Sequence, residues 1–383
     1  MIKIVLCCKN IRFAIIAKRN FTMDLNKKLM RRAMELAKRG RGNVSPNPLV
    51  GAVIVKNGRI VGEGYHKRAG TPHAEIIAIK RAGKNAKNSI LYVNLEPCCH
   101  YGKTPPCTDA IIKAGIKEVY VGIKDPNPLV NGKGIKILKK NGIKVQYPIL
   151  QDEVRKLNEF YITYTEKKRP FVILKIAQTI DGKIADRDGK SKWITNELAR
   201  KKVHSLRNSV DAILTGIGTV AKDNPQFTVR YKKTTKQPLS IVLDTHLKIN
   251  SKSNIIRQGT IIATSKNTDE RKEQLLRKKG VQIWKVKGED NTISIYEVLK
   301  KAYKAEIQSI FIEAGRRVVS SFLKEKLVDK IYIFIGNKIL GQGISAFEDL
   351  ETTKLSDAVI IRNIKFKRFN DNILIEGYVY GNY

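Results

Sequence analysis

The spacing of apolar positions predicts how the first third of the chain folds. From Asp24 onward, apolar residues recur every three or four positions, which predicts a helix with one buried face that ends at a pair of glycines. Residues 49–55 and 59–65 then have the pattern of two strands. Asn57-Gly58 between them is the strongest short signal for a tight turn, so the two strands are expected to form a hairpin.

The segments that follow alternate between helical and extended patterns. This alternation is typical of an α/β fold, in which helices cover a sheet on both faces. We expect helices at 74–83, 107–114 and 134–141 and strands at 89–95, 117–123 and 143–147. The first part of the chain is therefore predicted to be an α/β sandwich.

A second alternating region begins at Phe171, after a segment that resembles a connecting helix with a polar exit. We expect its strands at 171–177, 210–216, 239–244, 259–265, 309–313 and 331–335, and its helices near 196–208, 269–280, 294–305 and 316–326. A length of 383 residues also favours two domains, since one domain usually takes about 150. The expected division is an N-terminal extension (1–23), a first domain (24–149), a connecting segment (150–170) and a second domain (171–383).

Residues 1–23 contain five basic residues and no acid, which raises the question of a targeting peptide. Lys9 and Arg12 interrupt the apolar stretch, which argues against a secretory signal, and a transit peptide is usually richer in serine. An over-extended N-terminus ahead of the helix start at Asp24 explains the segment equally well.

Composition excludes several classes of protein. The hydrophobic fraction of 42% and the charged fraction of 28% are typical of globular proteins, and no run of about 18 apolar residues exists to cross a membrane. All five cysteines lie at or before position 107, an odd number, and the three that follow residue 23 all lie within the motif at 96–107. This favours a metal site over a disulfide framework. It also favours a reducing compartment, so we expect a cytoplasmic protein.

The net charge of +38 would suit a nucleic-acid-binding protein. The lysines are nevertheless spread over both halves of the chain, without the interleaved aromatic residues of a single-strand platform. We interpret most of them as solvated surface and expect no nucleic acid partner, although such a field would attract phosphorylated molecules. The alternative is an RNA base deaminase with a basic binding module, which the charge favours.

His73, Cys98 and Cys107 form the clearest chemical motif in the sequence. One imidazole and two thiolates are soft ligands for zinc, and three protein ligands leave a fourth position for water, as in catalytic sites. Glu75 lies two residues after His73 near a helix start and is placed to move protons. An H-x-E pair alone is weak, and Cys99 and His100 could compete as ligands, but the combination predicts hydrolytic deamination.

Three segments resemble the deaminase half of the bifunctional riboflavin-biosynthesis deaminase/reductase family. They are P-N-P-L-V-G (46–51), G-E-G-Y-H-K-R-A-G-T-P-H-A-E (62–75) and E-P-C-C-H-Y-G-K-T-P-P-C (96–107). Eight residues separate the two thiols here, unlike the usual C-x-x-C of nucleobase deaminases, and this spacing is normal in the family. The resemblance implies zinc on His73, Cys98 and Cys107 and proton transfer by Glu75, with Asn47 directed at the substrate; a plain turn role for Asn47 stays open.

The second half resembles the reductase domain of the same family, which is similar to dihydrofolate reductase. The likeness is carried by L-K-I-A-Q-T-I-D-G-K-I-A (174–185), S-K-W-I-T (191–195), T-G-I-G-T (215–219), D-N-P-Q-F-T-V-R (223–230) and E-A-G (313–315). It implies NADPH binding by Ala177, Trp193, Thr219, Asp223, Thr245, Gly315, Arg316, Arg317, Val318, Val319, Ser320 and Ser321. It implies substrate binding by Ser191, Arg207, Phe227, Arg230 and Glu313.

Elementary chemistry supports some of these roles. No metal cluster or nucleophile–base pair appears in the sequence after residue 170, so a cofactor is expected to supply the chemistry. Lys175 lies in an apolar strand, where an ammonium is costly unless it is paired, and Asp223 or Glu313 could be its partner in a substrate site or in a purely structural ion pair.

The same chemistry leaves other roles open. Arg207 and Arg230 suit a ribose phosphate but could be surface charge, and Trp193 could belong to the core. Phe227 is expected to act through its backbone, if at all. Arg316-Arg317 replaces the family's small, proline-containing turn, and these cations could bind the cofactor's 2′-phosphate or only alter the turn.

The resemblance implies a cytidine-deaminase-like α/β/α sandwich followed by a dihydrofolate-reductase-like α/β domain. The expected enzyme first deaminates 2,5-diamino-6-(5-phosphoribosylamino)pyrimidin-4(3H)-one with zinc. It then reduces the ribosyl group of 5-amino-6-(5-phosphoribosylamino)uracil to ribityl with NADPH. We expect small phosphoribosyl pyrimidines as its ligands and a homo-oligomer as its assembly. A reductase half that has become a scaffold is a further alternative.

Overall fold

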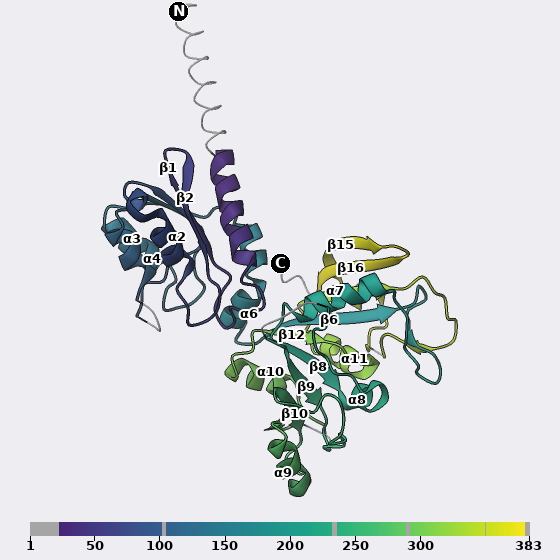
Figure 1. Cartoon of the computed structure of the whole chain (residues 1–383). Coiled ribbons are helices and arrows are strands. Elements are labelled where there is room, and N and C mark those ends of the chain that lie inside the picture. Colours follow the sequence, from purple (N-terminus) through teal and green to yellow (C-terminus); the bar gives the residue numbers. More distant parts are fainter. Residues whose placement is uncertain (1–22, 102–104, 232–235, 289–291, 349, 380–383) are drawn as a thin grey trace, which may run out of the picture. The chain divides into compact units, whose positions relative to one another are not determined.

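The computed structural model describes residues 23–101, 105–231, 236–288, 292–348 and 350–379 (Figure 1). The chain forms two compact units that divide between Glu166 and Lys167. The expectations for the extension at residues 1–22 lie outside the described residues. No helix in the described part of the chain is long and apolar enough to cross a membrane.

The first unit is built on a five-stranded sheet in the order β2-β1-β3-β4-β5. Its strands are β1 (Gly51–Lys56), β2 (Arg59–Tyr65), β3 (Ile90–Leu95), β4 (Glu118–Ile123) and β5 (Lys144–Gln146). β1 runs antiparallel to β2 and β3, whereas β3, β4 and β5 are parallel. The predicted hairpin is confirmed: Asn57 and Gly58 have φ angles of 49° and 75°, which are the two left-handed residues of a type I′ turn.

Helices cover both faces of this sheet, which confirms the predicted α/β/α sandwich. Alternate residues of β1 point to opposite faces, so Ala52 and Ile54 belong to one apolar cluster and Val53 and Val55 to another. The first cluster is covered by α2 (Ala74–Ala82), α3 (Cys107–Lys113) and α4 (Lys133–Lys140). The other face is covered by the helix of residues 23–38 and by α5 (Gln151–Leu157) and α6 (Glu159–Lys167).

The start of α2 is fixed by close packing on β2. A Cβ atom at Gly64 would lie 2.2 Å from the carbonyl oxygen of Ala74, so only glycine lets the helix approach the strand this closely. This contact sets the position of His73, the residue that precedes the helix.

The segment expected to be one connecting helix consists of two helices that break at Asn158. Val154, Leu157 and Ile162 are buried in the cluster that also contains Met30 and Met34 of the first helix. Helices α5 and most of α6 therefore belong to the core of the first unit.

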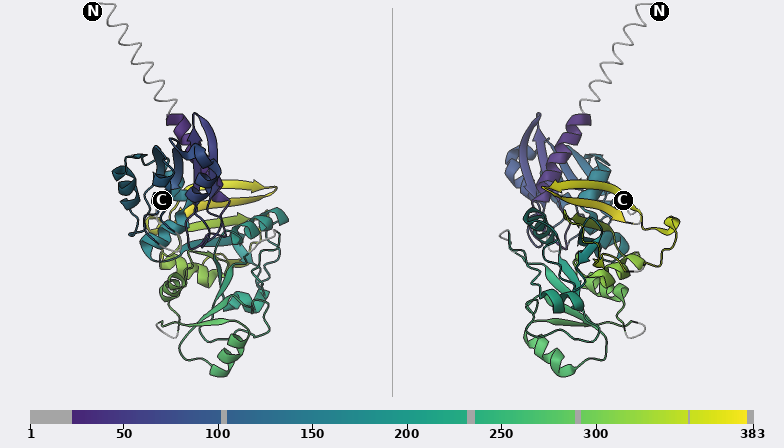
Figure 2. Two further views of the ribbon diagram at one scale, coloured as in Figure 1. Left: turned by 60° about the vertical axis from the view of Figure 1, so that its left-hand side comes forward. Right: turned by 90° about the vertical axis from the view of Figure 1, so that its right-hand side faces the viewer.

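The second unit contains a nine-stranded sheet in the order β11-β10-β9-β8-β12-β6-β13-β16-β15. The strands from β11 to β13 are parallel, and β16 and β15 extend the sheet as an antiparallel hairpin, yellow in Figures 1 and 2. The strands are β6 (Phe171–Gln178), β8 (Ala212–Gly216), β9 (Leu239–Leu243), β10 (Thr260–Thr264), β11 (Gln282–Lys285), β12 (Ser309–Ile312), β13 (Lys330–Ile335), β15 (Ile361–Phe369) and β16 (Asn372–Val379). A small separate sheet pairs β7 (Lys183–Ala185) with β14 (Ile344–Ser345).

Apolar clusters fill both faces of the large sheet, so the predicted α/β fold of this unit is confirmed. Its helices are α7 (Glu197–Arg207), α8 (Ile217–Asp223), α9 (Glu270–Lys278), α10 (Ile295–Lys304) and α11 (Arg316–Lys324). The sequence analysis missed β11, β15, β16, the two short strands of the small sheet and α8. Strand β15 mixes apolar with basic residues and exposes most of them, and a register shift between Arg362 and Lys365 interrupts its alternation; α8 begins in a glycine-containing turn.

The path of the chain through the large sheet reverses at β12. After β8 the chain adds β9, β10 and β11 outward, and it then returns to insert β12 between β8 and β6. In open parallel sheets, ligands bind at the carboxyl ends of the strands near such a reversal. The segments that follow β6, β8, β9 and β12 are therefore where a ligand is expected.

Candidate functional site

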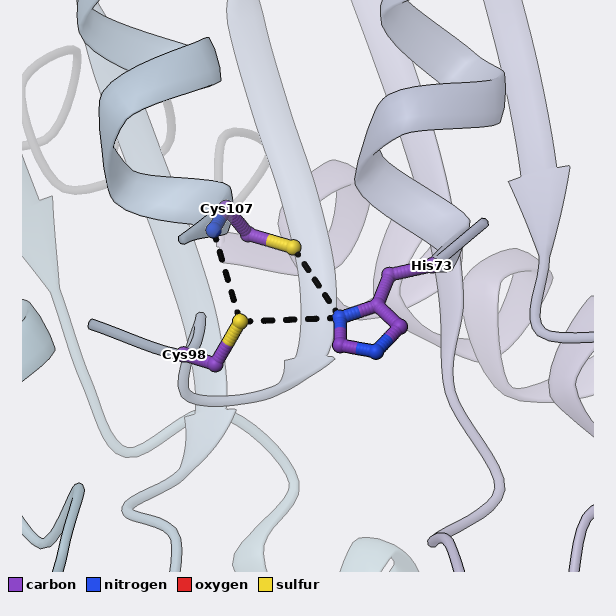
Figure 3. A group of neighbouring side chains, drawn as sticks. All are labelled: His73, Cys98 and Cys107. Carbon is purple, nitrogen blue, oxygen red and sulfur yellow. Dashed lines mark hydrogen bonds between the residues drawn. The ribbon is translucent and has the colours of Figure 1, made fainter. Parts of the chain in front are cut away.

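His73, Cys98 and Cys107 converge at one point of the first unit (Figure 3). His73 precedes α2, Cys98 follows β3 and Cys107 opens α3. The Nδ1 atom of His73 lies 3.2 Å from Sγ of Cys107 and 3.5 Å from Sγ of Cys98. All three ligand atoms lie within 4.8 Å of one another, as the ligands of one metal ion must.

The pKa values of the two thiols shift in opposite directions. The backbone N–H of Cys107, at the start of α3, donates to Sγ of Cys98 over 3.3 Å. Hydrogen bonding from Cys107 lowers the pKa of Cys98 to about 4, whereas the same contact and burial raise the pKa of Cys107. A thiolate on Cys98 is therefore favoured before any cation binds, and a cation would favour it on both.

Glu75 is buried in the first turn of α2, and its Oε2 atom has no hydrogen-bond partner. Burial raises the pKa of Glu75 to about 7, and the nearby charge of Cys98 adds to the rise. An unsatisfied buried carboxylate oxygen is costly, so its retention beside a nitrogen–sulfur ligand set points to a use. An imidazole and two thiols would hold a zinc ion, and an unpartnered acid beside them would suit proton transfer at such a site.

Asn47 is connected to the ligand cluster through His66. The Nδ2 atom of Asn47 lies 2.9 Å from Nε2 of His66, and the His66 ring packs edge-on against the ring of His73 with centroids 5.3 Å apart. An amide nitrogen only donates, so Nε2 accepts and Nδ1 carries the proton, directed at the carbonyl of Pro72 at 3.3 Å. Burial lowers the pKa of His66, which favours this neutral ring.

The sequence analysis left Cys99 and His100 as competing ligands, and neither joins the ligand group among the described residues. The thiol of Cys99 instead points at the carbonyl oxygen of Leu129, 3.9 Å away.

Glu96 is a residue that the sequence analysis did not single out. Its buried carboxylate accepts hydrogen bonds from the backbone N–H groups of Asp125 (3.2 Å), Gly132 (2.8 Å) and Ile135 (3.0 Å). These bonds fasten the segment that carries Cys98 to the start of α4. The partners lie 29 to 39 residues away in sequence, so no local pattern could have revealed them.

In the second unit, Glu313, Arg207 and Lys175 form a buried charge cluster at the end of β12. Arg207 donates to both carboxylate oxygens of Glu313, at 2.5 and 3.0 Å, and Nζ of Lys175 lies 3.6 Å from Oε2. Burial raises the pKa of Glu313, but the charges of Arg207 and Lys175 outweigh it and the pKa falls to about 2. Burial lowers the pKa of Lys175, and the charge of Glu313 offsets part of that.

The contacts decide which pairings form within this cluster. Between the two partners expected for Lys175, Glu313 is the one in ion-pair contact, while Asp223 acts on it only through its charge. The fork of Arg207 is directed at a protein carboxylate. The ring of Phe227 lies 5.4 Å from this guanidinium, and Phe227 itself has a left-handed backbone with φ of 49°.

The residues expected to hold a dinucleotide follow the carboxyl ends of parallel strands. Ala177 is the penultimate residue of β6, Thr219 lies in α8 directly after β8, Thr245 follows β9, and Gly315 caps the N-terminus of α11 after β12. A Cβ atom at Gly315 would lie 3.9 Å from Oγ1 of Thr219, so two of these segments meet.

Within α11 the expected cofactor residues differ in what they can offer. Val319 and Ser320 are buried, so they could contribute only backbone groups, and Val318 is only partly exposed. Arg316 and Arg317 both point at Glu348, with Nε–Oε1 distances of 3.2 and 3.6 Å. The hydroxyl of Ser321 donates to the carbonyl of Arg317 at 2.9 Å.

Ser191 and Trp193 line a pocket of about 360 Å³ between the loops that follow β6 and β13. Trp193 is 61% exposed, which excludes the alternative that it is a core residue, and the guanidinium of Arg200 lies 4.3 Å from its ring centre. The pocket also contains the lysines Lys183, Lys190, Lys192 and Lys338. Asp186 also lines the pocket, so four lysines face one acid beside the exposed indole, a balance that suits a phosphorylated ligand with a planar ring.

Arg230 lies apart from this pocket and is exposed. Its Nη1 atom donates to Gln226 at 3.4 Å, and its backbone N–H donates to Nδ1 of His204 at 3.3 Å. Asp223 ends α8. The structure therefore brings Arg207, Glu313 and Phe227 together and groups Ser191 with Trp193, while Arg230 stands outside both groups.

Comparison with protein families agrees with this division into two sites. Residues 23–123 match the model of the cytidine and deoxycytidylate deaminase zinc-binding region, and residues 170–375 match the RibD C-terminal domain. The riboflavin biosynthesis protein RibD of Aquifex aeolicus is 44% identical over 355 residues, which cover 92% of this chain and 98% of that protein. RibD of Escherichia coli is 38% identical over 344 residues, covering 86% and 92%.

Solved structures show the same likeness. Acinetobacter baumannii RibD superposes with a TM-score of 0.86 at 34% identity and covers 93% of this chain and 99% of its own. A Thermotoga maritima protein, named a diaminohydroxyphosphoribosylaminopyrimidine deaminase/5-amino-6-(5-phosphoribosylamino)uracil reductase, gives 0.82 at 40% identity, with 94% and 99% covered. None of these relatives supports the alternative of an RNA base deaminase. The chain therefore belongs to the RibD family and has its two enzymatic domains, a zinc-binding deaminase and a reductase of riboflavin biosynthesis.

Proposed function

We propose that the first unit deaminates 2,5-diamino-6-(5-phosphoribosylamino)pyrimidin-4(3H)-one at a zinc ion held by His73, Cys98 and Cys107. The observation that carries this proposal is the unpartnered, buried carboxylate oxygen of Glu75 beside three converging ligand atoms. When bound, zinc supplies a Lewis acid that lowers the pKa of a coordinated water molecule to about 7.

Glu75 is assigned the proton transfers of the deamination. A carboxyl group with a pKa of about 7 can take up and release protons at neutral pH. Glu75 would take one proton from the attacking water and pass it to the ring nitrogen, and would then take a second proton from the new hydroxyl group and pass it to the departing amino group, which leaves as ammonia. Asn47 is assigned the orientation of the pyrimidine, because its amide lies one ring away from the ligand His73. Cys99 and His100 have no assigned role.

We further propose that the second unit reduces the ribosyl group of 5-amino-6-(5-phosphoribosylamino)uracil with NADPH, which would supply a hydride. Ala177, Thr219, Thr245 and the segment 315–321 are assigned to the cofactor, since they follow the strands around the reversal at β12. Trp193 and Asp223 complete the proposed cofactor contacts.

For the substrate of the reductase we propose Lys175, Ser191, Arg207, Phe227, Arg230 and Glu313. Support comes from the buried charge cluster around Glu313 and from the lysine-lined pocket that contains Ser191. Because Glu313 engages Arg207 with both oxygens, a phosphate would have to share or displace this pair. Lys175 would then orient the sugar through its contact with the same carboxylate.

We assign the deaminase activity to residues 24–149 and the reductase activity to residues 171–383, and we propose that segment 150–170 connects the two domains while its helices pack in the core of the first unit. We also propose a cytoplasmic homo-oligomer that acts on small phosphoribosyl pyrimidines and takes no nucleic acid. Light scattering of the purified protein, with and without added RNA, tests the assembly and the lack of RNA binding.

Two assays test the proposed reactions. Purified protein loaded with zinc should release ammonia from the diaminopyrimidine, and failure to do so would reject the deaminase assignment. The same protein should oxidise NADPH when supplied with the deaminated product. Isothermal titration that detects no NADPH binding would instead favour a scaffold role for the second unit.

A further inference from the structure

The buried side-chain amide of Asn158, at the junction of α5 and α6, forms hydrogen bonds with Leu49 in the segment that carries Asn47. Asn158 is 2% exposed. Its Oδ1 atom accepts from the backbone N–H of Leu49 at 2.8 Å, and its Nδ2 atom donates to the carbonyl of Leu49 at 3.0 Å. One side chain thus satisfies both backbone polar groups of a residue 109 positions away.

A second buried amide completes this grip from the central sheet. Asn94 in β3 donates to the same carbonyl of Leu49 at 2.8 Å and accepts from the N–H of Gly51 at 2.7 Å. The carbonyl of Leu49 therefore uses both of its lone pairs. The peptide groups at residues 49–51 are held from two sides, by the sheet and by the helical junction.

The sequence between Leu49 and Asn47 is stiff. Pro46 and Pro48 flank Asn47, and each proline fixes its own φ near −65° and restricts the residue before it. The backbone N–H of Asn47 is also bonded to the carbonyl of Val44 at 2.8 Å. Because this backbone is stiff, fixing the position of Leu49 also fixes the position of Asn47.

We infer that Asn158 is a positioning residue of the deaminase reaction. It holds Leu49 so that the amide of Asn47 stays 2.9 Å from Nε2 of His66, beside the ligand His73. This inference rests on the proposed function, in which Asn47 orients the pyrimidine. The helical junction then belongs to the deaminase site, although Asn158 itself touches no reacting atom.

The first test replaces Asn158 by aspartate. Asn158→Asp keeps the shape and the acceptor for the N–H of Leu49, but it turns a carboxylate oxygen toward the carbonyl of Leu49 where a donor stood. We expect kcat/KM for ammonia release to fall about tenfold or more, since an unsatisfied buried group disturbs the segment. The zinc content and NADPH oxidation should stay at the wild-type level.

Asn141→Asp is the matched control. Asn141 ends α4 with an exposed amide that donates to the carbonyl of Ile137 at 2.9 Å. The same chemical change at this position should leave ammonia release unchanged.

A double-mutant cycle separates positioning from a general loss of structure. Once Asn47→Ala has removed the amide that Asn158 is inferred to position, Asn158→Asp should reduce kcat/KM by less than about twofold more. Losses that multiply in the double variant would overturn the inference, as would an Asn158→Asp enzyme with wild-type kcat/KM.

A second variant keeps the inference testable if Asn158→Asp fails to fold. Pro48→Ala leaves both amides in place but loosens the connection to Asn47, so it should also lower kcat/KM for ammonia release. An unchanged value in that variant would overturn the inference. Wild-type protein that releases no ammonia would reject the proposed function itself, whereas active wild type with unchanged variants would reject only the role of Asn158.

Discussion

The zinc-binding and reductase units solve the problem of buried charge in opposite ways. In the first unit, Glu75 keeps a buried oxygen without a partner beside His73, Cys98 and Cys107. In the second unit, Glu313 is saturated by Arg207 and Lys175. The difference is that Glu75 has a hydrogen-bonding capacity that protein groups leave unused, whereas the capacity of Glu313 is taken up by protein groups, so only the first site needs an added ion to complete it.

The largest expected effect is the loss of deamination in Glu75→Gln. The amide keeps the shape but cannot exchange protons, so ammonia release should fall by about 10²- to 10⁴-fold. Zinc content and NADPH oxidation should be unchanged, as measured by metal analysis and absorbance. Glu63→Gln, which weakens a part-buried pair with Arg32 that involves no ligand residue, is the control and should leave both reactions intact. Loss of zinc in Glu75→Gln would contradict the separation of ligand and proton carrier.

Removal of zinc should separate the two units in the same way. Incubation with a strong chelator should abolish ammonia release and leave NADPH oxidation intact, because the ligand group found among the described residues lies wholly in the first unit. Adding zinc back should restore the first reaction. A parallel loss of both activities would show that the units are coupled through the metal.

A large effect on stability is expected in the second unit when Glu313 is replaced by glutamine. The change leaves two largely buried cations without their counter-charge; breaking a fully buried cluster typically costs about 3–5 kcal/mol, so a loss toward the lower end of that range is expected here. Calorimetry should show a lower melting temperature for the second unit and no change for the first. Glu348→Gln, at an exposed pair with Arg316, should shift stability by less than about 0.5 kcal/mol.

The charge of Glu313 also predicts how the stability of the second unit depends on pH. Its pKa is lowered from 4.5 to about 2, so the unfolded chain binds a proton more readily than the folded one. The stabilisation is complete above pH 4.5 and is lost as the pH falls toward 2. The free energy of unfolding, measured by denaturant melts at several pH values, should fall more steeply with decreasing pH in wild type than in Glu313→Gln. Identical pH profiles for the two proteins would refute the charge-paired state.

The smallest effect is expected from removing the paired arginines at the start of α11. Arg316→Ala/Arg317→Ala breaks exposed contacts with Glu348 and should change stability little. If the pair also binds the 2′-phosphate, the KM for NADPH should rise several-fold while that for NADH stays constant. Equal changes for the two cofactors would limit the arginines to a role in the turn.

The metal ligands could be predicted because zinc chemistry restricts residue type and because each ligand stands at a helix or strand end. His73 and Cys107 adjoin helices whose patterns were legible, and the hairpin at Asn57-Gly58 followed from a strong local turn signal. Strand β15 could not be predicted in this way, because its residues are solvated on both faces and its pairing with β16 supplies what the pattern lacks.

The reductase site was less predictable from the residues themselves. The position of Lys175 in an apolar strand predicted an acidic partner for it. Which acid forms the ion pair, Glu313 or Asp223, depends on where β12 inserts in the sheet. Trp193 has a sequence context that fits a core residue, yet the loop it occupies leaves it exposed at a lysine-lined pocket. Neither the partner of Lys175 nor the exposure of Trp193 can be predicted from the neighbouring residues in the sequence.

The sequence by itself determined the chemistry: the ligand types, the acid beside them, the order of two α/β domains and the family they resemble. Only the tertiary structure decided which buried groups hold that chemistry in place. Glu96 grips backbone up to 39 residues away, and Asn158 grips Leu49 across 109 residues. Hydrogen bonds of this kind depend on how helices and strands pack against one another. Because packing is a property of the whole fold, short-range sequence patterns cannot predict these bonds.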